Sequence, residues 1–182
     1  MSITAFKKSW LIIAAVIATA CADSATSSRL QPTAPSFASR GLGACPDLVA
    51  DGELTFHAYA SGAQIYRWDG AAWVFIAPRA TLYADPGLHG VVGSHSAGPT
   101  WKSVSGSTVV AAVAKRCTPN QSAIPWLLLD ATSSAGPGVF RGVSHIQRLN
   151  ISGGVAPAAG GNTIGEIAEV PYTAEYLFFR RD

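Results

Sequence analysis

The chain has 182 residues, which allows one domain of ordinary size. Apolar residues make up 48% of it, so a wholly disordered chain is excluded. It carries 13 Lys and Arg against 11 Asp and Glu, and without Lys7 and Lys8 the two counts are equal. This balance excludes nucleic acids and anionic membrane surfaces as partners bound by bulk charge.

The first 22 residues follow the pattern of a secretory signal. Lys7 and Lys8 form a basic n-region, and an apolar run follows at residues 10–18. That run is too short to cross about 30 Å of hydrocarbon, so it does not predict a permanent membrane helix. We therefore expect an exported, extracytoplasmic protein.

Two cleavage sites fit this signal. Residues 18–21 (ATAC) resemble a bacterial lipobox, whose cysteine is lipidated, whereas residues 20–22 fit the small-x-small pattern of ordinary signal peptidase. The lipobox is favoured because Cys21 directly follows the apolar run, although Ala18 is unusual at its position. We expect a signal peptide at 1–21 and a lipid anchor at Cys21 that holds the protein in the bacterial envelope. The second site would instead give a secreted or periplasmic protein.

Residues 22–44 have the composition of a flexible tether. They are rich in Ser, Thr, Ala and Pro and have no apolar period. The domain predicted to fold therefore spans 45–182. Its two cysteines, Cys45 and Cys117, fit one disulfide formed in an oxidising compartment, and two free thiols are the alternative.

The domain has the pattern of short strands throughout. Tyr172, Ala174, Tyr176 and Phe178 alternate onto one face, and similar runs are separated by glycine and proline turns. Strands are expected at 54–59, 63–68, 72–76, 81–84, 90–94, 108–114, 126–129, 139–149, 164–170 and 172–179. The pattern predicts a single-domain, all-β sandwich or barrel of about 8–10 mostly antiparallel strands.

Common enzyme motifs are absent from the sequence, which has no GxSxG, GxGxxG, GxxxxGK, HExxH or CxxC. No cofactor is predicted, and the catalytic residues, if any, are unknown. Of the four histidines, His57 and His95 are weak candidates for metal ligands, because no His-x-His pair puts two ligands on one strand face. No metal site is predicted.

The segment 93–101 (GSHSAGPTW) presents His95 and Trp101 in a loop bent by glycine and proline. Aromatic residues near such loops could form a platform for a flat ligand or fill the core instead: Tyr66, Trp68, Trp73, Trp101 and Trp126. Arg148, next to Gln147, is suited to hold an anionic group or to tie a loop to its own backbone. The candidate ligand-binding residues are His95, Trp101, Tyr66, Gln147 and Arg148.

Five stretches together resemble the family known as domain of unknown function 3455: 62–66 (GAQIY), 93–101, 124–129 (IPWLLL), 146–154 (IQRLNISGG) and 170–176 (VPYTAEY). The similarity covers about residues 54–179, in the family's order. It implies a single domain and a secreted or lipid-anchored protein of bacteria or fungi, and it implies no activity, because the family has none established.

Two departures from that family are informative. Its members commonly carry cysteines where Trp68 and Gly161 stand here, so their joint absence is what the loss of a disulfide would leave, and Cys45–Cys117 is then an alternative disulfide. His145 stands where a tyrosine is usual, which makes it a poor candidate for a shared function, whereas His95 and Trp101 match the motif.

The leading hypothesis is an exported, lipid-anchored β-domain that binds a small molecule, a glycan or an envelope protein without catalysis. One alternative is an enzyme or metal-binding protein with a dispersed site around His95. We favour a protein without catalytic activity over an enzyme. The other alternative is a purely structural envelope protein.

Overall fold

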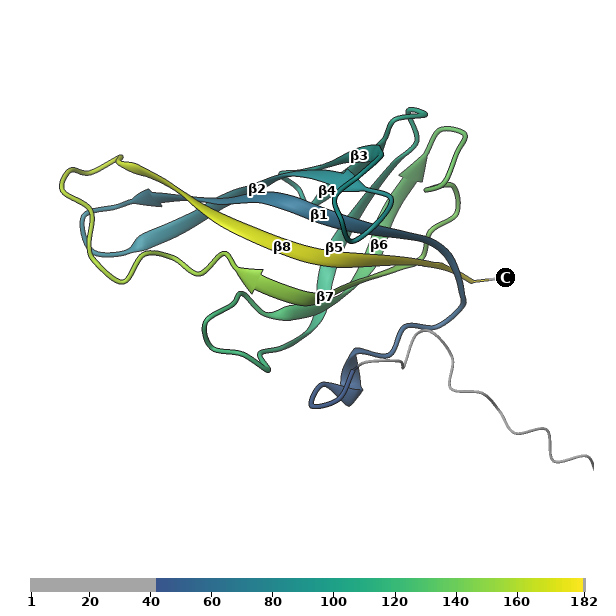
Figure 1. Cartoon of the computed structure of the whole chain (residues 1–182), viewed down its shortest axis with the longest axis horizontal. Coiled ribbons are helices and arrows are strands. Elements are labelled where there is room, and N and C mark those ends of the chain that lie inside the picture. The colour runs from purple at the N-terminus through teal and green to yellow at the C-terminus, as the bar shows by residue number, and fades with distance from the viewer. Residues whose placement is uncertain (1–41, 182) are drawn as a thin grey trace, which may run out of the picture. The chain divides into compact units, whose positions relative to one another are not determined.

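The computed structural model describes residues 42–181, which form an eight-stranded antiparallel barrel (Figure 1). The strands follow one another around the barrel in chain order, and β8 closes it by pairing with β1. They are β1 (Glu53–Trp68), β2 (Trp73–Tyr83), β3 (Val91–Ser96), β4 (Thr100–Ser103), β5 (Thr108–Cys117), β6 (Trp126–Ala135), β7 (His145–Gly153) and β8 (Ile167–Arg180). The predicted all-β, single-domain fold is confirmed, as the barrel.

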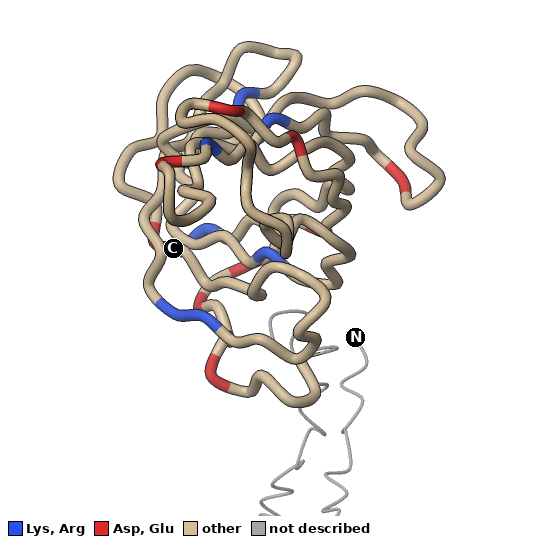
Figure 2. The backbone as a smooth tube through the Cα atoms, turned by 90° about the vertical axis from the view of Figure 1, so that its left-hand side faces the viewer, with Lys and Arg blue, Asp and Glu red and all other residues tan. Residues whose placement is uncertain are grey.

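The signal peptide, Cys21 and nearly all of the expected tether lie outside the described residues. Within residues 42–181 no helix is long and apolar enough to cross a membrane. A short 3-10 helix, η2 (Pro46–Leu48), precedes the barrel. Basic and acidic residues are interspersed over the barrel (Figure 2).

Three strands each replace two of the expected strands. β2 runs through Pro78 where strands at 72–76 and 81–84 were expected. β1 continues through Gly62, where two strands were expected. Residue 62 is a glycine because a Cβ there would lie 2.1 Å from the carbonyl oxygen of Arg79. The glycine lets β1 and β2 approach closely and does not end the strand. β8 likewise runs through Pro171, which pairs with Ala63.

The segment 93–101, expected to be a loop, is largely a hairpin. β3 and β4 pair from Gly93↔Ser103 to Ser96↔Thr100, and only residues 97–99 form the turn. The predicted strand 139–149 is shorter than expected, since β7 begins at His145.

Alternation along the strands separates an inner from an outer set of side chains. The inner set includes Tyr172, Ala174, Tyr176 and Phe178, so the predicted common face of β8 is confirmed. Trp101, from the short strand β4, is 1% exposed and packs among the rings of Tyr176 and Phe178.

Phe140 closes one end of the barrel. It belongs to the loop between β6 and β7, is fully buried, and packs against Phe178 and Phe56 with ring centroids 4.7 and 5.6 Å away. The Ser107 hydroxyl accepts a hydrogen bond from the Phe140 amide at 3.3 Å, and the Ser134 hydroxyl donates one to its carbonyl at 2.6 Å. These bonds hold the loop across the barrel end.

A second apolar cluster lies on the outer face of β6, β7 and β8. The segment 42–50 covers it and buries Leu42, Leu48, Leu128, Leu149, Leu177 and Phe179. Cys45 and Cys117 form a disulfide with a Cα–Cα distance of 5.8 Å, which ties this segment to the end of β5. The predicted disulfide is therefore present. Closing a loop of 72 residues stabilises the fold by about 4 kcal/mol in the chain-entropy model.

Candidate functional site

A pocket of about 430 Å³ occupies the end of the barrel opposite the loop of Phe140. It lies between the carboxyl-terminal halves of β1, β3 and β5 and the amino-terminal halves of β2 and β6. Its lining residues are Gln64, Tyr66, Phe75, Ile76, Pro78, His95, Ala97, Gly98, Pro99, Trp101, Val113, Arg116, Ile124, Pro125, Leu127, Leu129, Arg148 and Tyr176. The volume suits one small organic molecule.

The pocket opens beside the two shortest strands of the barrel, β3 and β4. β3 and β4 are short, so β3 pairs with β2 only between Ala80 and Tyr83, and β4 pairs with β5 only between Thr108 and Val110. The exposed lining side chains on either side of this gap are those of Phe75, Ile76, Val113 and Arg116. A ligand therefore has an apolar mouth with one cation beside it.

Four of the five predicted ligand-binding residues line this pocket. Tyr66, His95, Trp101 and Arg148 come from β1, β3, β4 and β7 respectively, and all four side chains are on the inner face of the barrel. These four residues are far apart in the sequence, and the strands that carry them come together only when the barrel closes.

Gln147 is not part of the pocket. It lies on the outer face of β7, and its Nε2 donates a hydrogen bond to the carbonyl of Leu48 at 2.6 Å beneath the segment 42–50. Neighbouring residues of a strand face opposite sides, so Gln147 and Arg148 cannot serve the same site.

His95 forms the floor of the pocket together with Trp101. The two rings are stacked, with centroids 4.3 Å apart and an angle of 12° between their planes. The Nδ1–H of His95 donates to the Thr100 carbonyl at 3.0 Å, because a carbonyl can only accept. The neutral ring therefore presents Nε2 as an acceptor.

Burial is the main cause that lowers the pKa of His95, to about 3. The positive charge of Arg148 also lowers it, and the hydrogen bond to Thr100 opposes both effects. Because only 3% of the residue is exposed, water cannot stabilise an imidazolium there. His95 is uncharged at neutral pH.

Arg148 is a partly buried cation inside the barrel. One of its N–H groups, on Nη2, donates to the Pro125 carbonyl at 2.8 Å, while its buried Nε has no hydrogen-bond partner among the described residues. None of the described lining residues is acidic, and none of the ion pairs within residues 42–181 includes Arg148.

Two buried polar residues of the pocket, Gln64 and Tyr176, were missed by the sequence prediction. Tyr176 is fully buried, and its hydroxyl is hydrogen-bonded to the side chains of Tyr172 and Arg148. The buried Nε2 of Gln64 has no hydrogen-bond partner in the described part of the chain. Burial raises the pKa of Tyr176, and Arg148 lowers it by a smaller amount. The inward alternation of β8 and the motif 62–66 were the signals that could have identified these two residues.

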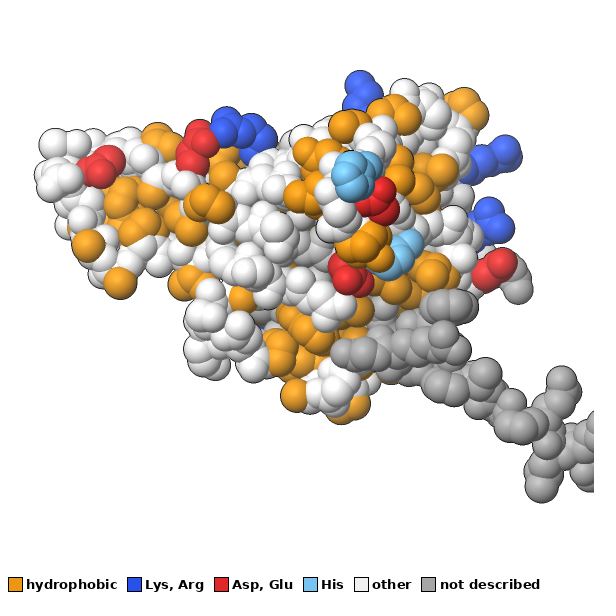
Figure 3. All heavy atoms as spheres, in the orientation of Figure 1, with side chains coloured by type: hydrophobic (Ala, Val, Ile, Leu, Met, Phe, Trp, Pro, Cys, Tyr) orange, Lys and Arg blue, Asp and Glu red, His pale blue; other side chains and the backbone are white. Residues whose placement is uncertain are grey.

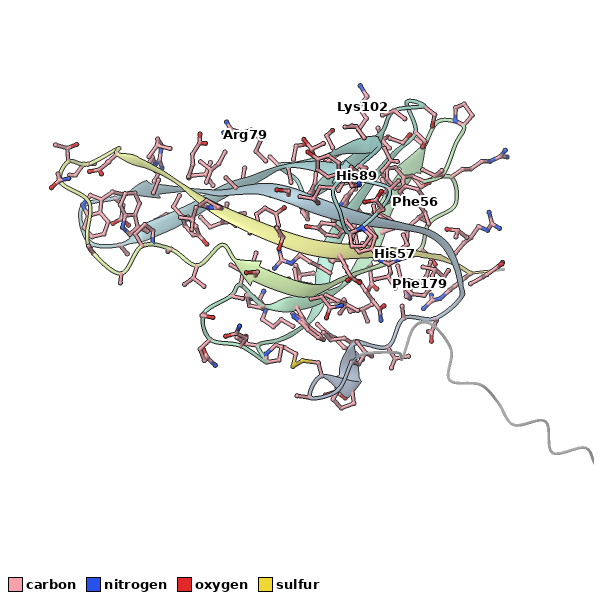
Figure 4. The ribbon with its side chains drawn as sticks, viewed as in Figure 1. Phe56, His57, Arg79, His89, Lys102 and Phe179 are labelled. Carbon is pink, nitrogen blue, oxygen red and sulfur yellow. A yellow bond between two sulfur atoms is a disulfide. The ribbon has the colours of Figure 1, made fainter. Side chains whose placement is uncertain are left out.

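The two weak metal candidates do not share a site. His57 lies on the outer face of β1 (Figure 4), where its Nε2 is 3.4 Å from Glu175. His95 instead lines the pocket inside the barrel. His89 occupies the same outer side as His57. Within residues 42–181 no group of three or more His, Cys, Asp or Glu is arranged to hold a metal ion.

The aromatic residues proposed as a platform are dispersed. Tyr66 and Trp101 line the pocket, but Trp68 and Trp73 pair at the tip of the β1–β2 hairpin, with ring centroids 5.5 Å apart. A Cβ built on Gly161 would lie 2.9 Å from Cβ of Trp68. The two positions at which family members carry cysteines are thus neighbours in space.

Comparison with known proteins gives a family but no activity. A family model described as "Protein of unknown function (DUF3455)" matches residues 49–180, which includes the whole barrel. No curated protein and no solved structure matches the chain. Since the matched region covers most of the sequence, the chain belongs to the DUF3455 family of proteins of unknown function.

Proposed function

We propose that this protein binds one small, largely apolar molecule inside its barrel and does not transform it. The observation that carries this proposal is the pocket of about 430 Å³, closed at one end by the packed core around Phe140 and open at the other. Ligand pockets have this size and this mainly apolar lining. Phe75, Ile76 and Leu127 supply part of that lining.

The chemistry of the lining favours binding over catalysis. The described lining residues include no Ser, Thr, Cys, Lys, Asp or Glu, so His95 has neither a nucleophile to activate nor a carboxylate to orient it within the pocket. Its Nδ1 is engaged by the Thr100 carbonyl. These features support a receptor or carrier more than an enzyme with a site around His95.

The proposed setting is the outside of the cell. The signal-like residues 1–21 and the lipobox-like cysteine Cys21 support export and anchoring to the bacterial envelope. The disulfide between Cys45 and Cys117 fits an oxidising compartment. In this arrangement the tether 22–44 leads from the membrane to the barrel.

The proposal is tested with N-phenyl-1-naphthylamine, a neutral apolar fluorophore. We expect the purified domain to bind it at one site, with a rise in its fluorescence. A Leu127→Trp variant fills the pocket, and we expect it to weaken binding by at least about tenfold, the effect of losing about 1.4 kcal/mol.

Ala112→Trp is the matched control, because Ala112 is exposed on the outer face of β5. It adds the same indole outside the pocket and should bind as the wild type does. Circular dichroism of both variants checks that they are folded. Absence of saturable binding, or equal weakening by both substitutions, would contradict the proposal.

A further inference from the structure

The pocket holds a positive charge that the rest of the barrel does not neutralise. Arg148 is the inner cation, and Arg116 is a second, exposed one at the mouth. Every lining side chain other than these two arginines is uncharged at neutral pH, because burial keeps His95 neutral. Burying a cation without a counter-charge is unfavourable, so a bound anion would stabilise Arg148.

Polar groups around Arg148 are of the kind that an anion requires. Nε2 of Gln64 and Nε of Arg148 itself are donors, both are buried, and neither has a hydrogen-bond partner in the described residues. The Tyr176 hydroxyl is hydrogen-bonded to the side chains of Arg148 and Tyr172. Burial raises the pKa of Tyr176, which keeps its hydroxyl protonated and able to donate. Buried donors without partners are uncommon in folded proteins, and a ligand is one way to satisfy them.

The charge of Arg148 reaches several of these groups. Burial raises the pKa of Tyr66 and Tyr176 and lowers that of His95; the charge of Arg148 opposes the first two shifts and adds to the third, as expected of a guanidinium close to all three. Its position thus marks the inner, polar end of the pocket. The outer part of the lining is apolar and includes Phe75, Ile76 and Val113.

We propose that the ligand is a monoanion with an apolar body, an aliphatic or aromatic carboxylic acid, whose carboxylate pairs with Arg148 and whose body fills the apolar part of the pocket. This assignment rests on the proposed function, since it names the class of molecule that the same pocket binds. Arginine forms strong, charge-assisted hydrogen bonds with carboxylates. One inner cation matches one negative charge, so a dianionic phosphate would keep an excess charge in an apolar site.

The test measures displacement of N-phenyl-1-naphthylamine at pH 7.5 by compounds that share a ten-carbon chain. Decanoate, decanamide, decylamine and decyl phosphate differ in charge while their apolar bodies are similar. For the wild type we expect decanoate to displace the fluorophore at about 10- to 100-fold lower concentration than decanamide. Decylamine should be the weakest competitor, and decyl phosphate should be weaker than decanoate.

An Arg148→Gln variant should reduce the preference for decanoate over decanamide to about threefold or less, mainly by weakening the binding of decanoate. Arg79→Gln is the matched control, because Arg79 lies outside the pocket and is paired with Glu169. It should keep the wild-type preference. The comparison of ligands on the wild type stands even if Arg148→Gln fails to fold.

Different results would contradict the carboxylate assignment and the proposed binding function. Equal displacement by decanoate and decanamide would overturn the carboxylate assignment and leave the proposed function standing. Tighter binding of decyl phosphate would overturn it as well. Failure of the wild type to bind the fluorophore or any of the four compounds would overturn the proposed function itself.

Discussion

The imidazole of His95 shows how one buried side chain makes the fold sensitive to pH. Its pKa is about 3 in the folded protein and close to 6.5 in the unfolded chain. Below pH 6.5 the unfolded chain therefore binds a proton that the folded protein does not, which favours unfolding. The contribution of His95 is fully present above pH 6.5 and is lost as the pH falls toward 3.

We expect the His95→Asn variant to lose less stability in acid than the wild type. Asparagine retains a donor for the Thr100 carbonyl but does not titrate. Between pH 7 and pH 4 the drop in unfolding free energy should be about 3 kcal/mol smaller in the variant. Urea unfolding at both pH values measures this, and parallel losses in the two proteins would show that His95 is not the cause.

At the scale of elements, the loop between β6 and β7 decides which end of the barrel is closed. Phe140 is fully buried between Phe56 and Phe178, while its neighbour Val139 is 40% exposed. The loop is attached to the barrel through Ser107 and Ser134. A packed end and an open end give the barrel one mouth instead of a channel.

We expect Phe140→Ala to lower the unfolding free energy by about 3–5 kcal/mol, because it removes a buried ring and leaves a cavity. Val139→Ala, one residue away, should change it by less than about 1 kcal/mol. Thermal or chemical unfolding of both variants gives the comparison. A small loss in Phe140→Ala would mean that the loop can leave the barrel end at little cost.

The hairpin of β1 and β2 carries apolar side chains beyond the packed barrel. Figure 3 shows hydrophobic side chains over the end of the molecule formed by β1, β2 and the start of β8. Phe75 and Ile76 are about half exposed and also line the pocket mouth. The hairpin therefore forms one apolar wall of the mouth.

At the scale of the whole molecule, the proposed anchor at Cys21 gives a direct prediction. Grown with an alkyne-tagged fatty acid, bacteria that express the full chain should incorporate the tag into the wild type and not into a Cys21→Ser variant. The wild type should be recovered with membranes. An untagged wild-type protein that begins at Asp23 would support ordinary signal cleavage instead.

Much of the fold could be predicted because strand formation is encoded locally. Alternation with a period of two residues predicts both the strands and their inner faces, as in Tyr172, Ala174, Tyr176 and Phe178. Interruptions were harder to interpret. Gly62 and Pro171 are common breakers, yet both lie within strands. Gly62 is required there because β2 approaches too closely for a side chain, and Pro171 pairs with Ala63 across the sheet.

The candidate site was only partly predictable for a related reason. The residues were selected by type and neighbourhood, and Tyr66, His95, Trp101 and Arg148 do line one pocket. Gln147 was selected with Arg148 but lies on the outer face, and Tyr176 was missed although its inward face was predicted. Residue types with suitable chemistry can be selected from the sequence. Which of them lie in one site depends on whether each side chain is on the inner or the outer face of its strand.

The family, the all-β class and the alternating faces could be read from the amino-acid sequence, since these follow from motifs and from a local repeat. The sequence also pointed to the pairing of Cys45 with Cys117. Tertiary structure alone decided that the sheet closes between β1 and β8, that Phe140 fills one end, and that Arg148 is enclosed without a carboxylate. These features depend on pairing between residues far apart in the chain, and no local pattern specifies that register.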